Sequence, residues 1–268
     1  MKLINQSFEI IESTGYTIDD IYKSIELVGR VSHKSEDRIT EDSAKTFVEK
    51  MMKMKHLSTC EFGTVYLEID NSNDIVLLLE LNPYTKCKTI NNKCYVTTNL
   101  RVLLEHDATW LLIYMCEPTK YHHKRYTVKF ICDRGILAEF TRHRRFSFMA
   151  ESTRYCNYSK GKFNNELTFI EPCWDWREVT RDGFVAFRTA VVEAENMYFY
   201  LLKNGWKPEQ ARNILPLSLK TELYMCGFAE DWEKFFELRT ASNAHPQARE
   251  LAIPLKEEFI SKNYLQLE

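Results

Sequence analysis

The order of hydrophobic patterns along the chain constrains its fold more than any other feature. Segments rich in β-branched, aromatic and alternating apolar residues favour strands, mostly in the first half, at 3–12, 62–69, 75–81, 126–132 and 135–141. After Pro172 the pattern turns helical, at 175–203, 208–215, 218–227, 231–240 and 246–261. Because no repeat or linker divides residues 1–268, we expect one α+β domain. It would have a central, mainly antiparallel sheet, helices packed around it, and a helical C-terminal half.

Three helices are also expected in the first half of the chain. Thr17 precedes an amphipathic run and Asp20 follows three residues later, a pairing typical of a capped helix that ends near Gly29. Apolar residues recur at helical spacing over 41–55, and 98–116 is largely apolar. Asn71 to Asn73 favour a turn, and 117–125 a loop.

The charge balance excludes a broad basic surface for nucleic acid. Lys and Arg number 36 against 38 Asp and Glu, which leaves a formal net charge of -2. Glycine contributes 8 residues, and neither G-x-G-x-x-G nor G-x-x-x-x-G-K-[ST] occurs. Any anionic ligand must therefore be bound by a local cluster of side chains.

The cysteines and the N-terminal sequence favour a cytoplasmic protein with reduced thiols. The first residues lack the pattern of a signal peptide, and no apolar run is long enough to cross a membrane. The 8 cysteines include no C-x-x-C pair. Cys87, Cys94, His122 and His123 match no common zinc spacing, so we expect no metal site.

The segment 138–162 concentrates positive charge directly after a predicted strand. It contains Arg142, His143, Arg144, Arg145 and Arg154. One interpretation is a solvated basic face. Another is an anion site, because arginine binds phosphate in a bidentate manner and keeps its charge at every working pH. A third is a module for single-stranded nucleic acid, since Arg, Phe and Tyr alternate here, although the net charge argues against it.

The spacing of residues within this segment forms a motif that can be compared with those of known families. Arg142-His143-Arg144, seven further residues and Ser152 form R-H-R-x7-S, followed by Arg154-Tyr155. His56-x-Ser58-x-x-Glu61 lies upstream, and Ala211-Arg212, Leu215-Pro216-Leu217 and Leu238-Arg239 lie downstream. Together these motifs resemble the flavin-dependent thymidylate synthases. The likeness covers both ends of the chain, and its main interruption is an insertion at about 67–126.

The resemblance implies a reaction and its cofactors. Enzymes of this family convert dUMP to dTMP with methylenetetrahydrofolate as carbon donor, and FAD reduced by NADPH supplies the hydride. The resemblance also implies a homotetramer with active sites at subunit interfaces. It implies no role for nucleic acid or a membrane.

The resemblance assigns roles residue by residue. Arg239 matches the arginine beside the uracil ring and His56 a flavin-side residue, and these two are the catalytic candidates. The expected cofactor contacts are Ser58, Arg142, His143, Arg144 and Lys234. The expected substrate contacts are Glu139, Arg142, Ala150, Glu151, Ser152, Thr153, Arg154, Arg212 and Arg239. Backbone N–H groups and side chains at 152–154 would form a nest for the dUMP phosphate.

Several positions depart from the family pattern. Glu139 replaces a usual glutamine and can pair with an arginine instead, and Ala150 replaces a usual Glu or Gln. Phe228, Glu230 and Lys234 stand where the family has flavin contacts. These departures leave open an alternative, a degenerate relative that binds nucleotide without turnover.

Overall fold

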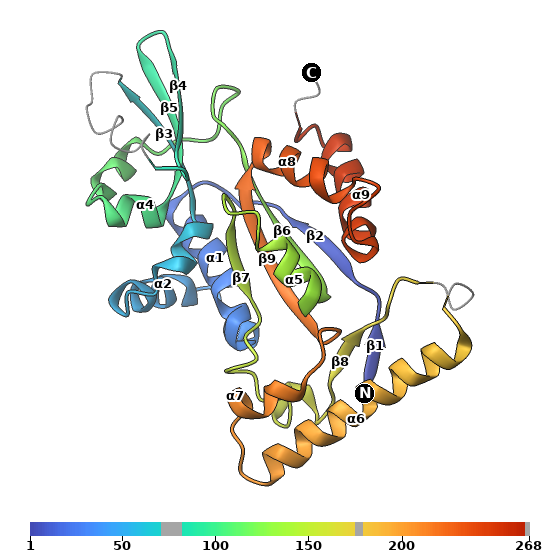
Figure 1. Cartoon of the computed structure of the whole chain (residues 1–268). Helices are drawn as coiled ribbons and strands as arrows, with labels where there is room; N and C mark the ends of the chain where they lie inside the picture. Colours follow the sequence, from blue (N-terminus) through green and yellow to red (C-terminus); the bar gives the residue numbers. More distant parts are fainter. Residues whose placement is uncertain (71–81, 175–178, 266–268) are drawn as a thin grey trace.

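The structure is a computed structural model that describes residues 1–70, 82–174 and 179–265 (Figure 1). Its strands are β1 (Lys2–Ile4), β2 (Ser7–Ile11), β3 (Thr64–Asp70), β4 (Lys86–Ile90), β5 (Lys93–Asn99), β6 (Arg125–Asp133), β7 (Ser147–Ala150), β8 (Thr168–Ile170) and β9 (Lys220–Phe228). Its α-helices are α1 (Ile18–Gly29), α2 (Ser43–Lys53), α4 (Leu100–Glu105), α5 (Arg134–Phe140), α6 (Arg181–Lys203), α7 (Pro208–Ala211), α8 (Ala229–Arg239) and α9 (Pro246–Ser261). Short 3-10 helices are η1 (Arg30–His33), η2 (Glu36–Arg38), η3 (Leu57–Phe62), η4 (Thr109–Tyr114), η5 (Gly161–Phe163) and η6 (Arg212–Ile214).

A central antiparallel sheet in the order β2-β6-β9-β7 organises the molecule. Side chains on one face, including Phe130 and Met225, pack with Trp232 and Phe235 of α8 in a core that α5 and α9 complete. The opposite face is covered by the end of α1 and η1. This arrangement confirms the α+β class and the antiparallel sheet.

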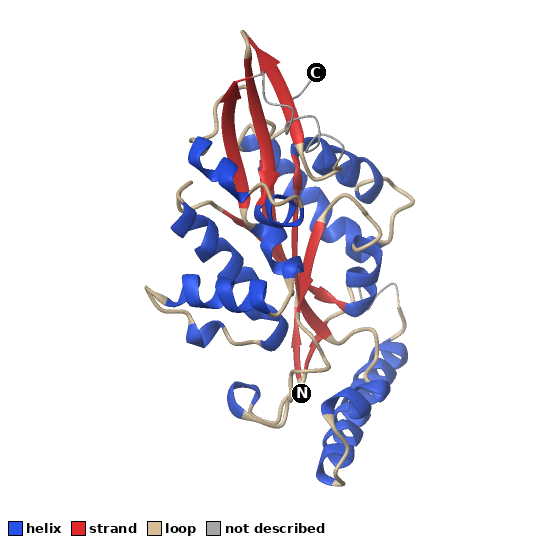
Figure 2. Cartoon of the chain, turned by 90° about the vertical axis from the view of Figure 1, so that its left-hand side faces the viewer, coloured by secondary structure: helices blue, strands red, loops and turns tan. Residues whose placement is uncertain are grey.

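The segment predicted as an insertion folds as its own three-stranded sheet, in the order β3-β5-β4 (Figure 2). It has a separate apolar core with α4 and η4. The chain enters and leaves this segment at neighbouring positions. Arg125 donates from Nη1 to Thr64 Oγ1 at 3.1 Å and to the carbonyl oxygen of Glu61 at 3.2 Å. This closure explains how the segment can extend from the central sheet without interrupting it.

Several helices lie where the sequence predicts them. Thr17 accepts a hydrogen bond from the backbone N–H of Asp20, and the Asp20 carboxylate accepts from the N–H of Thr17 at 3.0 Å. This capping box begins α1 as predicted. The expected helices at 41–55, 231–240 and 246–261 are confirmed as α2, α8 and α9.

Three predicted elements are wrong. Residues 135–141 form α5 rather than a strand, because Asp133 Oδ1 accepts from the N–H of Ile136 at 2.7 Å and caps a helix. Residues 218–227 form most of strand β9 rather than a helix. The expected helix 98–116 breaks at Asp107, whose positive φ of 52° ends α4 before η4 begins.

Other expectations are only partly met. The single strand expected at 3–12 is split, since β1 pairs with β8 while β2 forms an edge of the central sheet. The expected helix 175–203 is found as α6 from Arg181, and its first residues, 175–178, lie outside the described residues. The strand expected at 75–81 and the turn at 71–73 also lie outside them.

The cysteine prediction needs correction. Cys87 and Cys94 form a disulfide across strands β4 and β5, with their Cα atoms 6.3 Å apart. The strand register places them diagonally, since Cys87 pairs with Val96 and Cys94 with Thr89. Among the described residues, no helix is long and apolar enough to cross a bilayer.

Candidate functional site

The arginine-rich motif forms the turn between α5 and β7. Arg142, Arg144 and Arg145 are exposed there, and we find no carboxylate partner for them in the described part of the chain. His143 instead points into the core, with its ring centroid 5.0 Å from that of Phe235. Three exposed guanidinium groups on one turn suit an anion such as a phosphate or diphosphate.

Arg239, at the end of α8, is held rigidly against this turn. Its Nη1 donates to Glu139 Oε2 at 2.6 Å, its Nη2 to the Glu139 carbonyl at 2.7 Å, and its Nε to His143 Nε2 at 2.9 Å. Burial and the charge of Arg239 lower the pKa of His143 to about 4, so the ring is neutral and can accept this bond. The prediction that Glu139 pairs with an arginine is confirmed.

A cavity of about 580 Å³ borders Glu139, the partner of Arg239. Asp133, Glu139 and His245 line it together with the aromatic rings of Trp174 and Phe184. Aromatic walls with polar groups at one end are typical of a pocket for a planar, hydrogen-bonding ligand. The cavity therefore places such a ligand next to the Glu139–Arg239 pair.

The Ser152–Arg154 loop is a turn anchored at both sides. The N–H of Ser152 donates to the Ser32 carbonyl at 3.1 Å, and Ser152 Oγ accepts from the N–H of Arg154 at 3.3 Å. Arg212 Nη1 donates to Thr153 Oγ1 at 3.2 Å. The structure thus brings together the two segments that the sequence assigns to one phosphate.

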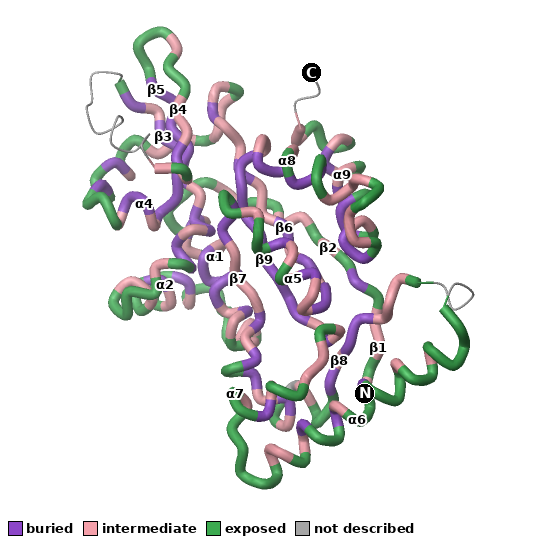
Figure 3. Tube along the Cα trace, viewed as in Figure 1, coloured by how far each residue is buried: buried purple, intermediate pink, exposed green. Residues whose placement is uncertain are grey.

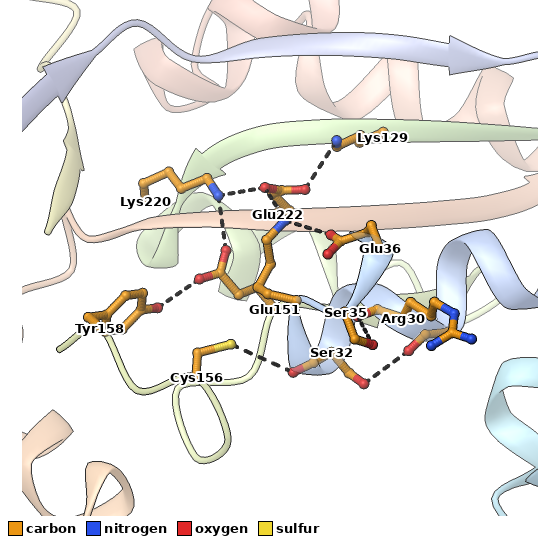
Figure 4. Close-up of polar contacts among 12 residues, drawn as sticks. Arg30, Ser32, Ser35, Glu36, Lys129, Glu151, Cys156, Tyr158, Lys220 and Glu222 are labelled. Carbon is orange, nitrogen blue, oxygen red and sulfur yellow. Dashed lines mark hydrogen bonds and ion pairs between the residues drawn. The ribbon is translucent and has the colours of Figure 1, made fainter. Parts of the chain in front are cut away.

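Glu151 differs from its neighbours in the loop. It is predicted as a substrate contact, yet its side chain is 2% exposed and accepts from Tyr158 Oη at 2.8 Å and Lys220 Nζ at 3.0 Å (Figure 4). Lys220 also contacts Glu222, which pairs with Lys34 at 2.7 Å. Glu151 therefore fixes the start of the loop through a buried ionic network instead of facing a ligand. Ala150, the residue before it, is half-buried at the end of β7.

His56 and Ser58 are exposed at the start of η3. His33 lies nearby and was not indicated by any sequence motif. Its ring stacks on Tyr155 with centroids 4.2 Å apart, and its Nδ1 lies 2.8 Å from Ser32 Oγ. Burial and the charges of His56 and Lys50 lower the pKa of His33. Only tertiary packing places this histidine beside the S-x-R-Y motif.

The predicted site residues form two separate groups. Arg239, Glu139 and His143 lie where α8 meets α5, whereas Arg212 and Thr153 lie near α7, toward the other end of the sheet (Figure 1). No hydrogen bond or ion pair within the described ranges joins the groups. One chain alone therefore does not bring the expected base-binding and phosphate-binding residues into contact.

The departures from the family motif also have definite positions. Phe228 is buried at the end of β9, and Glu230 opens α8, where it pairs with Lys86 at 2.9 Å and with His123 Nδ1 at 2.6 Å. Lys234 is exposed on α8. Lys86 and His123 both belong to the segment predicted as an insertion.

Comparison with known proteins gives a consistent result. A model of the family described as thymidylate synthase complementing protein matches residues 116–262. A probable flavin-dependent thymidylate synthase of Paramecium bursaria Chlorella virus 1 is 31% identical over 149 residues, covering 51% of this chain and 66% of the viral protein. A flavin-dependent thymidylate synthase of Synechocystis is 30% identical over 143 residues, covering 50% of this chain and 65% of the relative. The chain thus spans just under two thirds of the length of these curated relatives.

Among solved structures, a UMP/dUMP methylase, PolB from Streptomyces cacaoi bound with 5-Br dUMP, has a TM-score of 0.47 and 18% identity. That match covers 99% of this chain and 93% of the other.

Proposed function

Because the chain belongs to the thymidylate synthase complementing protein family, we propose that it is a flavin-dependent thymidylate synthase. It would convert dUMP to dTMP, with methylenetetrahydrofolate as carbon donor and NADPH as the source of electrons for FAD. The observation that carries the proposal is that Glu139, which lines a cavity with aromatic walls, fixes the guanidinium of Arg239. Cytoplasmic location stays a prediction from the sequence.

The proposed role of Arg239 is electrostatic. Negative charge develops along the N3–C4 edge of the uracil ring as C5 becomes nucleophilic, before it attacks the carbon donor. A guanidinium already oriented by Glu139 and His143 stabilises that charge without reorganising. The neutral state of His143 matters here, because a protonated ring would repel Arg239.

The proposed phosphate site consists of Ser152, Thr153, Arg154 and Arg212. The hydroxyl groups of the anchored loop donate to phosphate oxygens, and Arg212, already at Thr153, adds a bidentate cation. Arg142 and Arg144 would hold the flavin, with His56 and Ser58 at its other side. Bound FAD supplies the hydride, and the residues of this chain position the reactants and neutralise their charges.

We also propose that the enzyme assembles as a homotetramer with sites between subunits. The Arg239 and Arg212 groups lie apart in one chain, so a second copy would bring one group to the other. The long helix α6 is largely exposed along the molecule's edge (Figure 3), including Val185 at 54% and Tyr200 at 59%. An apolar exposed helix of this kind is typical of a surface that packs against another subunit.

The proposal is tested by the absorbance spectrum of the purified protein. We expect flavin bands that bleach under anaerobic NADPH and return when dUMP and methylenetetrahydrofolate are added together. A protein that remains colourless after incubation with FAD would contradict the proposal. A protein that binds FAD and dUMP but never reoxidises with both substrates would instead support the degenerate relative.

Replacing Arg212 with alanine should weaken substrate binding selectively. Loss of one bidentate cation from a phosphate site should raise the KM for dUMP by about 10- to 100-fold. We expect FAD affinity to stay unchanged, because Arg212 belongs to the phosphate group of residues. The matched control is Arg38→Ala, which removes an exposed arginine on η2. An equal KM in both variants would place the phosphate elsewhere.

A further inference from the structure

The cofactor side of the site is here the arginine turn at 142–145 together with the start of α8. We propose that the inserted segment is part of this side, where Lys86 neutralises Glu230 and so allows an anionic dinucleotide to bind. The inference rests on the proposed function and extends it to a segment that the family motifs do not include. It makes Lys86 a positioning and charge-balancing residue, not a catalytic one.

The inserted segment touches the cofactor side at several points. Arg101 Nη1 pairs with Glu61 Oε1 at 2.5 Å, and Tyr84 Oη donates to the carbonyl oxygen of Arg144 at 3.4 Å. Lys86 Nζ lies 2.9 Å from Glu230 Oε2 and 4.6 Å from the ring centroid of Phe228. The insertion therefore packs against the arginine turn and against the start of α8 at once.

The start of α8 carries two acidic residues beside that turn. Burial alone would raise the pKa of Glu230, but hydrogen bonds from His123 and Lys86 lower it to about 2. Asp231 is buried, which raises the pKa of its carboxyl group, and the charges of Lys86 and Arg145 oppose this shift. Glu230 is thus negatively charged at every working pH, and its neighbour Asp231 is close enough to Arg145 of the arginine turn for that charge to favour its ionised form.

Such a carboxylate repels a diphosphate unless a cation offsets it. At an effective dielectric constant near 20, two unit charges about 12 Å apart interact strongly enough to change affinity about tenfold. Lys86 supplies this cation from β4. His123 holds the other Glu230 oxygen, so removing the Lys86 amine leaves Glu230 anchored and exposes its charge.

The experiment measures the Kd of FAD by quenching of flavin fluorescence in four proteins and one control. These are the wild type, Lys86→Ala, Glu230→Gln and the double variant. Lys88→Ala is the matched control, because Lys88 is exposed on the same face of β4, two residues further from α8. We expect Lys86→Ala to raise the Kd about tenfold and Lys88→Ala to leave it unchanged.

Adding Glu230→Gln to Lys86→Ala should restore the Kd to within about twofold of wild type, because the unbalanced charge is then gone. Salt at about 0.5 M should shrink the effect of Lys86→Ala. A purely structural role of Lys86 would produce neither the rescue nor the salt dependence.

Three results would overturn the inference. Lys86→Ala could bind FAD as tightly as wild type, it could weaken binding only as much as Lys88→Ala, or the double variant could fail to recover. In each case wild-type FAD binding and turnover would still support the proposed function. If wild-type protein binds no FAD, the proposed function fails first and this inference fails with it.

Discussion

Arg239→Ala should lower the rate of dTMP formation by about 100- to 1,000-fold while FAD stays bound. The guanidinium is fixed by Glu139 and His143, so its loss removes a preorganised charge from the position where negative charge develops. Arg239→Lys should recover only part of the rate, because a lysine ammonium cannot reproduce the three-way anchoring. Stopped-flow reoxidation of the reduced enzyme with dUMP and methylenetetrahydrofolate measures this step directly.

The control for this variant is Arg38→Ala, which removes an exposed arginine on η2. Its rate should equal that of wild type. If Arg239→Ala reoxidises at the wild-type rate, the guanidinium does not act on the reacting ring. If it instead loses its flavin, Arg239 serves the cofactor and the assignment to uracil is wrong.

Glu222→Gln should lower the free energy of unfolding by about 3 kcal/mol. Glu222 lies within 3.1 Å of the ammonium groups of Lys34, Lys220 and Lys129 (Figure 4). Glutamine keeps the shape of the side chain but leaves these partly buried cations without their shared counter-charge. Urea denaturation at pH 7 measures the difference, and Glu9→Gln, exposed on the edge strand β2, should change stability by less than about 0.5 kcal/mol.

The lowered pKa of Glu222 predicts how the free energy of unfolding depends on pH. Burial would raise the pKa of Glu222, but Lys220 and Lys34 lower it to about 2, below its ordinary value of 4.5. A depressed pKa stabilises the folded protein above the ordinary value, and this contribution is lost as pH falls toward 2. The stability difference between wild type and Glu222→Gln should therefore shrink as the pH falls from about 5 toward 2. A difference that stays constant over that range would show that the charge of Glu222 does not stabilise the fold.

Whether a helix or strand could be predicted from the sequence depended on whether local or distant contacts determine it. Helix α1 is predictable because Thr17 and Asp20 are three residues apart and cap each other. Strand β9 is not, because it is buried on both faces from Thr221 to Phe228 and so has no alternation to distinguish it from a buried helix. Helix α5 is missed because the capping of Ile136 by Asp133 outweighs the strand propensity of a short apolar run.

The candidate site shows the same division. The resemblance to the family predicts that the arginines at 142, 144, 154, 212 and 239 bind anions, and the scarcity of glycine indicated that side chains would do so. The departure at Glu139 even suggested an arginine partner. Neither the stacking of His33 on Tyr155 nor the burial of Glu151 could be inferred, because both depend on segments far apart in the sequence.

The sequence by itself therefore determined the family, and it predicts which residues bind anions and where an insertion lies. These properties depend on residue identity and short spacing, which are written directly in the chain. The tertiary structure alone decided that Arg239 is oriented by Glu139 and His143, that Arg212 meets Thr153, and that Lys86 of the insertion pairs with Glu230. Each of these pairings joins distant segments, and electrostatic and hydrogen-bond energies depend on the distance between atoms, which folding of the whole chain sets.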